Sequence, residues 1–299
     1  MVHTPVLLEE TLFFLDVRPG ARFIDATADG GGHAIAILDR IRPSGKLLAI
    51  EWDEELFERL RERLAKICMP TSKSCVLRRG SYTDLYRFAR SSSCIPAAGV
   101  LFDFGMSSFQ LEASSRGFSF QKSEPLDMRM SRELAESAAD VLARRSAVEL
   151  EAILRDLGEE PCARRIASAI SAARRTHPIR RTNDLVAIIR QAVPVWYRRR
   201  RIHFATRTFQ ALRIAVNREL ENIPRGLAAA CRILAPGGRI VAISYHSLED
   251  RLVKQFFRNE GVRSVFRTLT PKPVRPSRRE VLGNPRARSA RLRAFERIP

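Results

Sequence analysis

The sequence lacks the cysteine pattern of a disulfide-stabilised or zinc-binding protein. Its 5 cysteines are odd in number and far apart, and none forms a C-x-x-C pair or lies near a group of histidines. A chain of 299 residues with 45% apolar residues can bury a core without such crosslinks. We therefore expect a reduced, cytoplasmic protein, and we predict no metal site.

Long apolar runs are also missing. No stretch approaches the ~18 uninterrupted apolar residues that cross a bilayer. The first residues lack a basic region followed by an apolar core. We therefore expect neither secretion nor membrane insertion. Repeats and low-complexity linkers are absent too, and only the Pro- and Arg-rich stretch 271–279 predicts a mobile loop.

Acidic residues are scarce relative to basic ones. The chain has 52 Lys and Arg against 33 Asp and Glu, a formal net charge of +19, and arginine far outnumbers lysine. A GC-rich genome or a need for solubility would also produce this excess. However, Arg198 to Arg201 form a run beside Trp196 and Tyr197. The guanidinium group grips phosphate and stacks on bases, so this clustering favours a nucleic acid as partner.

Short apolar runs alternate with helical patterns in the way that βαβ units around a parallel sheet require. The runs cover 22–26, 46–50, 75–77, 99–102 and 239–244. After the fourth run about 100 residues pass before a predicted helix over 205–223, which leads through Pro236-Gly237-Gly238 into the fifth strand. We therefore predict an α/β fold with a Rossmann-like, mostly parallel sheet and an inserted helical domain.

The predicted domain bounds follow from this interval. Residues 1–110 and 206–299 form one discontinuous domain, and residues 111–205 form the insertion. Helices are expected in the insertion because Ser146 and Glu149 form a capping-box pattern and Thr182 can cap a helix over 184–192.

A glycine cluster follows the first predicted strand. Gly30 to Gly32 and His33 come after this strand, and the second strand ends in Glu51. A strand, a glycine-rich turn, a helix and an acid about 20 residues further on are typical of a site for the ribose of an adenosyl cofactor. The same glycines would also fit a turn that only closes a loop.

Longer motifs occur in a fixed order along the chain. They are His3–Glu10, Asp25-x-Thr27 with Gly31–His33, Asp103–Leu111, Arg116–Phe120, Pro125–Met130, Gly158–Glu160, Ala205–Arg213, Leu234–Gly238, Ser244–Arg251 and Asn284–Ser289. Through these motifs the sequence resembles, nearly end to end, the S-adenosylmethionine-dependent methyltransferases that methylate N4 of a cytidine in 16S ribosomal RNA.

The resemblance implies a class I methyltransferase fold, S-adenosylmethionine as cofactor, and 16S rRNA of the small ribosomal subunit, in its decoding region, as partner. The oligomeric state stays open between monomer and homodimer. The resemblance further implies cofactor contacts at Gly31, Gly32, His33, Glu51, Tyr82, Asp103 and Gln110. Taken without the resemblance, Tyr82 would also fit a core aromatic and His33 a helix cap.

Cytosine N4 is a poor nucleophile, so a hydrogen-bond acceptor beside it would help the transfer. Asp103 is the first candidate for this catalytic role or for positioning the amino group of the cofactor, and Ser107, Ser108 and His246 come second. The candidate RNA-binding residues are Arg198, Arg199, Arg200, Arg201, Arg207, His246, Arg286 and Arg288, with Phe118, Phe120, Trp196 and Tyr197 as candidate stacking residues. Each arginine would also fit a solvated surface, and each aromatic a core.

Three residues depart from the pattern of the family: Asp29 replaces glycine, Glu51 replaces aspartate and Phe204 replaces proline. Asp29 lies beside the glycine turn and could block the cofactor site. The alternative that the protein is a non-catalytic RNA-binding ribosome assembly factor therefore stays open. A DNA or small-molecule methyltransferase is a further alternative. A nicotinamide dehydrogenase is disfavoured by the Pro236-Gly237-Gly238 turn and by the pattern over 291–298, which resembles a closing antiparallel strand.

Overall fold

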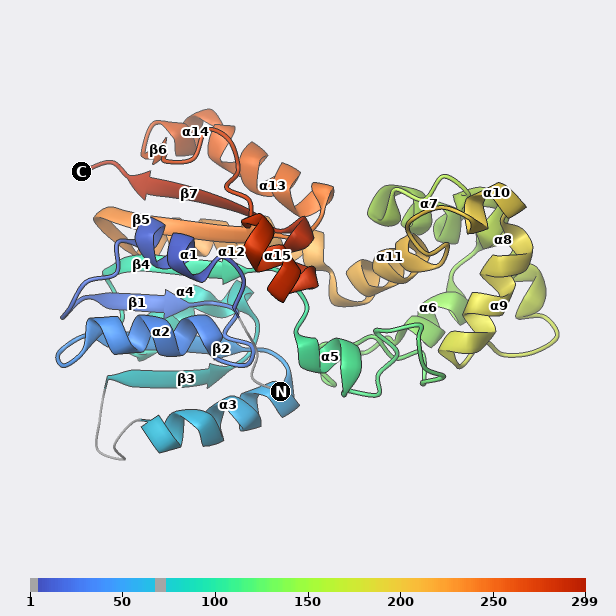
Figure 1. Cartoon of the computed structure of the whole chain (residues 1–299), viewed down its shortest axis with the longest axis horizontal. Helices are drawn as coiled ribbons and strands as arrows, with labels where there is room; N and C mark the ends of the chain where they lie inside the picture. Colours follow the sequence, from blue (N-terminus) through green and yellow to red (C-terminus); the bar gives the residue numbers. More distant parts are fainter. Residues whose placement is uncertain (1–4, 68–73) are drawn as a thin grey trace. The chain divides into compact units, whose positions relative to one another are not determined.

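A computed structural model describes residues 5–67 and 74–299 of the chain (Figure 1). His3 and Thr4 of the first motif, and Cys68, lie outside this part. The chain divides into two compact units, residues 1–105 with 220–299 and residues 106–219. The sequence predicts domain boundaries at 110/111 and 205/206 instead, and these boundaries stay a prediction. Each unit is described by itself below.

The first unit contains a sheet of seven strands in the order β3-β2-β1-β4-β5-β7-β6 (Figure 1). The strands are β1 (Arg22–Asp25), β2 (Lys46–Glu51), β3 (Cys75–Arg79), β4 (Ala97–Asp103), β5 (Leu234–Ser244), β6 (Phe266–Thr268) and β7 (Arg291–Arg297). Strands β1 to β5 pair in parallel, and β7 runs antiparallel between β5 and β6. The predicted mostly parallel sheet and its closing antiparallel strand are therefore confirmed.

Strand β5 begins earlier than predicted. It starts at Leu234 and includes Pro236, Gly237 and Gly238, which were expected to form the turn before it. Its pairing with β4 shifts register between Ala97 and Gly99, and Gly237 has a φ of 73°. The glycines therefore form an irregular first part of the strand, where a positive φ is tolerated.

Helices cover both faces of this sheet. In the first unit they are α1 (Leu8–Leu15), α2 (Gly32–Ile41), α3 (Glu54–Ile67), α4 (Leu85–Ser91), α12 (Glu219–Ile233), α13 (Ser247–Arg258), α14 (Glu260–Arg263) and α15 (Arg278–Gly283), with 3-10 turns η1 (Tyr82–Asp84) and η2 (Pro285–Ser289). Successive strand residues point to opposite faces, so Phe23 joins the core beneath α1 and α2 while Ile24 joins the core beneath α4 and α12. None of the helices in the described part is both long and apolar enough to span a bilayer.

The second unit is helical and has its own buried core. It contains α5 (Ser108–Glu112), α6 (Ala138–Arg144), α7 (Ala147–Gly158), α8 (Ala163–Ala173), α9 (Thr182–Ala192), α10 (Val195–Arg198) and α11 (Thr206–Asn217). The predicted capping box of Ser146 and Glu149 is confirmed. The predicted cap at Thr182 is wrong, because α9 begins at Thr182 with Arg181 as its N-cap. The Thr182 hydroxyl instead donates to the Lys122 carbonyl, at 2.5 Å.

The helix predicted over 205–223 is two helices. Helix α11 ends at Asn217 and α12 starts at Glu219, because Arg218 between them adopts a left-handed conformation with a φ of 51°. The buried Asn217 amide holds the end of α11 by donating to the Met128 carbonyl, at 2.8 Å, and by accepting from Met130 N at 2.7 Å. These long-range bonds explain a break that local sequence preference does not predict.

Candidate functional site

The carboxyl ends of β1, β2 and β4 place three acidic residues at one edge of the sheet. Asp25, Glu51 and Asp103 are the last residues of these strands, and β1 lies between β2 and β4. The chain leaves β1 toward β2 on one side and later returns to β4 on the other side. In open α/β sheets such a switch in strand order forms the crevice where ligands bind.

The glycine turn between β1 and α2 is tight, and two of its residues have left-handed backbone. Gly31 N donates to the Ala28 carbonyl at 2.8 Å, and Gly31 has a φ of 80°. A Cβ atom at Gly31 would meet the tip of the Leu60 side chain and would be strained at this φ, so the position favours glycine. Asp29 has a φ of 47°, which explains why the family usually carries glycine there. Aspartate tolerates this conformation better than most residues, and the turn forms with Asp29 in place.

Glu51 ties this turn to β2. Its Oε2 accepts a hydrogen bond from Asp29 N at 2.7 Å, and its Oε1 accepts from Asp53 N at 2.8 Å. Burial raises the pKa of Glu51 to about 8, and the negative charges of Asp29 and Asp53 add to this, although the two backbone hydrogen bonds lower it. Replacing aspartate by glutamate thus keeps a carboxyl group within reach of the turn.

Asp25 adds a second strongly shifted carboxyl group. Burial raises its pKa to about 7, a hydrogen bond from Thr27 N lowers it, and the charges of Asp103 and Asp29 raise it. Asp25 Oδ2 has no hydrogen-bond partner among the described residues. Several buried carboxyl groups that repel one another would be stabilised by a positively charged ligand.

Asp103 is held from several sides. Its backbone N–H donates to Thr27 Oγ1 at 2.6 Å, and its Oδ2 lies 3.7 Å from His33 Nδ1. His33 Nε2 lies 3.0 Å from the Val6 carbonyl oxygen, which can only accept, so this nitrogen carries a proton. The alternative that His33 caps its helix is wrong, because Gly31 is the N-cap of α2 and no side chain caps it.

Tyr82 lies just after β3, as the first residue of η1. Its half-buried ring packs edge-on against Phe102 and Phe104, with ring centroids 5.7 and 5.8 Å apart. Tyr82 is therefore part of an aromatic cluster beside the end of β4. Its predicted contact with adenine stays a prediction.

Gln110 belongs to the helical unit, where it serves helix α5. Its Oε1 accepts from Ser107 N at 3.1 Å, and Ser107 Oγ accepts from Gln110 N at 3.0 Å, which forms a capping box. Both side chains are buried, so local structure explains them. The predicted cofactor contact of Gln110 and the catalytic role considered for Ser107 stay predictions, and the side chain of Ser108 lies outside the described part.

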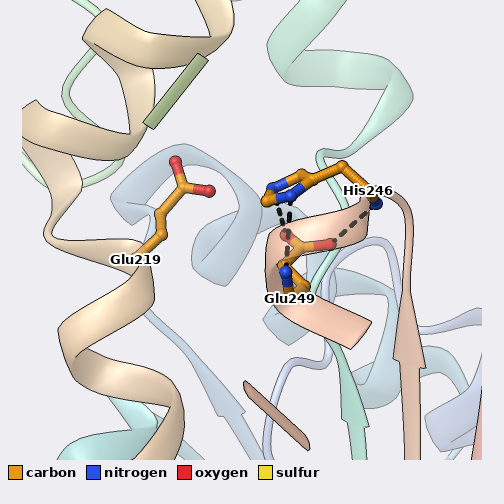
Figure 2. A group of neighbouring side chains, drawn as sticks. All are labelled: Glu219, His246 and Glu249. Atoms are coloured by element: carbon orange, nitrogen blue, oxygen red, sulfur yellow. Dashed lines mark hydrogen bonds and ion pairs between the residues drawn. The ribbon is translucent and has the colours of Figure 1, made fainter. Parts of the chain in front are cut away.

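His246 is the N-cap of α13, in the turn that follows β5. Figure 2 shows its imidazole turned onto the Glu249 carboxylate, with Nε2 3.0 Å from Oε1. Glu249 is 1% exposed, and its Oε2 also accepts from Tyr245 N at 2.7 Å. The geometry gives His246 a structural role, and the roles predicted for it in RNA binding and as a second-choice catalytic acceptor stay predictions.

The sequence reasoning named neither Thr27 nor Tyr245 as a site residue. Thr27 links the ends of β1 and β4 by accepting from Asp103 N while its own N–H donates to Asp25 Oδ1. The Tyr245 ring packs against Gly105 just after β4. Burial raises the pKa of Tyr245 well above its ordinary value, and the negative charge of Asp103 adds to this. Both residues lie inside quoted motifs, Asp25-x-Thr27 and Ser244–Arg251, which was the signal that could have pointed to them.

The helical unit presents the predicted arginine run to solvent. Arg198, Arg199, Arg200 and Arg201 are all exposed, and Trp196 beside them is 61% exposed. The Arg200 guanidinium lies 5.7 Å from the centre of the Trp196 ring. Trp196 is thus an open aromatic surface surrounded by positive charge, as a stacking residue requires.

The other aromatics considered for stacking are mostly core residues. Tyr197 is 3% exposed, and its hydroxyl donates to the buried Glu160 at 2.8 Å. Phe118 is buried, and half-buried Phe120 stacks on His203 at 4.4 Å. Phe204, where the family usually has proline, also packs into this core. The core alternative therefore explains Phe118 and Tyr197.

The remaining arginines differ in exposure. Arg207 of the helical unit donates to the Glu159 carbonyl and so helps to join α11 to the end of α7. Arg286 and Arg288 belong to the first unit, in η2, where Arg286 is half-buried and Arg288 is exposed. Their predicted contacts with RNA stay predictions.

Comparison with known proteins gives concordant results. A family model described as the MraW methylase family matches residues 1–298. A protein of Thermomicrobium roseum named ribosomal RNA small subunit methyltransferase H is 49% identical, over 99% of this chain and 94% of its own length. A protein of the same name from Syntrophus aciditrophicus is 43% identical, over 99% of this chain and 98% of its own length.

Among solved structures, a protein of Clostridium thermocellum described as a "putative rRNA-methylase" has a similar fold. Its TM-score is 0.50 at 10% sequence identity, and the match covers 98% of both chains. At this identity the likeness concerns the fold alone, and it confirms the class I methyltransferase fold predicted from the sequence.

Proposed function

We propose, since this chain belongs to the MraW methylase family, that it transfers a methyl group from S-adenosylmethionine to N4 of a cytidine in the decoding region of small-subunit ribosomal RNA. Curated relatives at 49% and 43% identity carry the name of a small-subunit rRNA methyltransferase. The observation that carries the proposal is the group of Asp25, Glu51 and Asp103 at the carboxyl ends of the neighbouring strands β1, β2 and β4, with the glycine turn tied to Glu51 through Asp29 N.

The residues at these strand ends and in the glycine turn fit the methyl donor. S-adenosylmethionine supplies, when bound, a methyl group on a positively charged sulfur that is already a strong electrophile. The N–H groups at the start of α2, after Gly31, suit the carboxylate of the methionine part. Glu51 suits the ribose hydroxyls. Asp25 Oδ2 has no hydrogen-bond partner among the described residues, and a cationic ligand would stabilise the charged form of this carboxyl group.

We assign to Asp103 the role of accepting the hydrogen bond from the reacting N4 amine. The N4 lone pair is shared with the cytosine ring, and a carboxylate that accepts an N4 hydrogen localises this pair on nitrogen. Asp103 would accept the proton that N4 must lose on taking the methyl group, which bound S-adenosylmethionine would supply. The 2.6 Å bond from Asp103 N to Thr27 Oγ1 fixes the backbone from which this side chain acts.

The product of the reaction provides the direct test. The protein is incubated with labelled S-adenosylmethionine and 30S particles, free 16S RNA or duplex DNA, and the labelled nucleoside is identified by mass spectrometry after digestion. We expect N4-methylcytidine from 30S particles above all other substrates, because the target must be presented unstacked. Predominant labelling of DNA would refute the substrate. Binding of the donor without transfer to any of these substrates would favour a non-catalytic assembly factor.

The exposed arginine run gives a second prediction. Replacing Arg198, Arg199 and Arg201 together by glutamine should weaken RNA binding and make the slope of log K against log salt shallower by about 2, since each phosphate contact to single-stranded RNA contributes roughly 0.7. Trp196→Ala should weaken binding by about 1–3 kcal/mol with little change in this slope, because stacking involves no charge. Fluorescence titration with labelled RNA at several salt concentrations measures both quantities.

Matched controls come from the same unit. Arg144 and Arg155 are also exposed, but they are paired with Glu136 and Asp156. Their replacement by glutamine should leave the salt slope within error of the wild type. If the Arg144 and Arg155 variant made the salt slope as shallow as the test variant does, the arginine run over 198–201 would not be the RNA-binding surface.

A further inference from the structure

The segment of residues 5–7 packs against the first turn of α2. A Cβ atom added to Gly32 would lie 3.0 Å from Pro5 Cβ, so the proline ring lies directly on this glycine. The carbonyl oxygen of Val6, the next residue, lies 3.0 Å from His33 Nε2 and accepts its proton. Gly32 and His33 are two of the residues predicted to contact the methyl donor. Segment 5–7 therefore borders the proposed donor site.

Leu7 ends this segment in a backbone conformation that leucine rarely adopts. Its φ of 53° and ψ of 41° lie in the left-handed region. Its side chain is fully buried, and its carbonyl oxygen accepts from Thr11 N at 2.8 Å at the start of α1. Such a conformation is unfavourable for a residue with a side chain, and it persists only where the surrounding contacts impose it. The backbone N–H of Leu7 is therefore a point at which the segment can be held.

Glu280 of α15 holds this N–H from far along the chain. The N-cap of α15 is Ser277, whose hydroxyl oxygen accepts from Glu280 N at 3.1 Å. A glutamate at this position commonly accepts in return from the N-cap N–H, as Glu149 does in α7. Glu280 Oε1 instead accepts from Leu7 N, at 2.7 Å and 273 residues away in the sequence. The carboxylate thereby joins α15 to segment 5–7.

We propose that Glu280 is a positioning residue for binding of the methyl donor, which holds segment 5–7 on the first turn of α2 through Leu7 N. A carboxylate makes a stronger hydrogen bond to a backbone N–H than a neutral acceptor does. Without this bond the backbone of Leu7 can relax toward an ordinary conformation, which moves the segment away from Gly32 and His33. The inference rests on the proposed function, because the segment that Glu280 holds borders the proposed donor site.

Glu280→Ala should raise the calorimetric Kd for S-adenosylmethionine about 10-fold, the size of effect expected for losing one hydrogen bond to a charged group. The reason is that only protein with the segment in place binds the donor well, and an apparent affinity falls in proportion to this fraction. A saturating donor concentration restores the fraction, so kcat should stay within about 2-fold of wild type. Glu280→Gln should keep the wild-type Kd within about 3-fold, because its amide oxygen still accepts from Leu7 N.

Two further variants test whether the effect passes through the segment. Pro5→Ala removes the ring that lies on Gly32, so it should also raise the Kd for the donor. In the Glu280→Ala background it should add little, because both changes act on the same segment. Glu9→Ala is the matched control. Glu9 is an exposed acid on α1 that pairs with Arg40 of α2 at 3.1 Å, and its loss should leave the Kd within about 2-fold of wild type.

Hydrogen exchange tests the contact in protein without the donor. By NMR, the Leu7 amide should exchange at least about 10-fold faster in Glu280→Ala than in wild type, and at close to the wild-type rate in Glu280→Gln. A Leu7 amide that stays equally protected in Glu280→Ala, or a Kd for the donor within about 2-fold of wild type, would overturn the inference. If wild-type protein binds the donor but methylates no RNA, the proposed function fails, and calorimetry with hydrogen exchange still decides the role of Glu280.

Discussion

Asp103→Asn is expected to lower the rate of methyl transfer about 10²- to 10⁴-fold, the usual contribution of a group that accepts a proton in the transition state. The amide keeps the shape of the side chain, and the bond from the backbone of residue 103 to Thr27 Oγ1 does not involve the carboxylate. An amide oxygen cannot take the N4 proton at neutral pH. The folded structure should therefore survive while the chemistry is lost.

Single-turnover transfer to 30S particles measures this loss directly, and calorimetry with S-adenosylmethionine measures binding separately. Asp39→Asn is the matched control, because Asp39 lies exposed on α2, where it pairs with Arg42 at 3.3 Å. The control should keep the wild-type rate. An Asp103→Asn protein that transfers methyl groups within 3-fold of wild type would remove Asp103 from the reaction, and the acceptor would have to be sought elsewhere in the site.

The sheet could be predicted from the sequence because its signals are local. Buried parallel strands read as short apolar runs, and Gly31 marks a backbone conformation that other residues avoid. The residues at the strand ends could be named for the same reason. Their mutual contacts could not be named, because Asp103 and Tyr245 become neighbours only when β4 and β5 pair.

The aromatic residues show a second limit of the sequence. Trp196 and Tyr197 are adjacent, yet Trp196 is 61% exposed and Tyr197 is 3% exposed. Consecutive residues of a helix point in different directions, so only one of them can face the core. The choice is set by Glu160, whose carboxylate accepts from the Tyr197 hydroxyl and which lies in another segment of the chain. Composition alone cannot reveal such a partner.

The largest expected effect on stability is that of Asp250→Ala. Asp250 on α13 is 9% exposed and pairs with Arg293 on β7, which is 7% exposed, through contacts of 2.6 and 3.2 Å. Removing the carboxylate leaves a buried guanidinium without its charge partner, which typically costs about 3–5 kcal/mol. Asp84→Ala breaks an exposed pair with Arg87 at 3.2 Å and should change the free energy of unfolding by less than about 1 kcal/mol.

Urea unfolding of the first unit can be followed by one fluorophore. The chain has 2 tryptophans, Trp52 in the first unit and Trp196 in the second, so a Trp196→Phe background leaves Trp52 as the reporter. The double variant Asp250→Leu with Arg293→Leu should recover much of the loss, because it buries no unpaired charge. A single variant as stable as wild type, or a double variant no better than the single one, would contradict the assignment.

The pH dependence of this loss has a definite sign. Burial by itself would raise the pKa of Asp250, but the hydrogen bonds and charges of Arg293 and Arg291 outweigh it, and the pKa lies below its ordinary value. Its contribution is therefore fully present above the unfolded pKa of about 3.9 and is lost as the pH falls through the lower folded value. The difference between wild type and Asp250→Ala should be constant from pH 8 to about pH 5 and should shrink below about pH 4. A difference that grew as the pH fell would mean that Arg293 is not stabilised by this carboxylate.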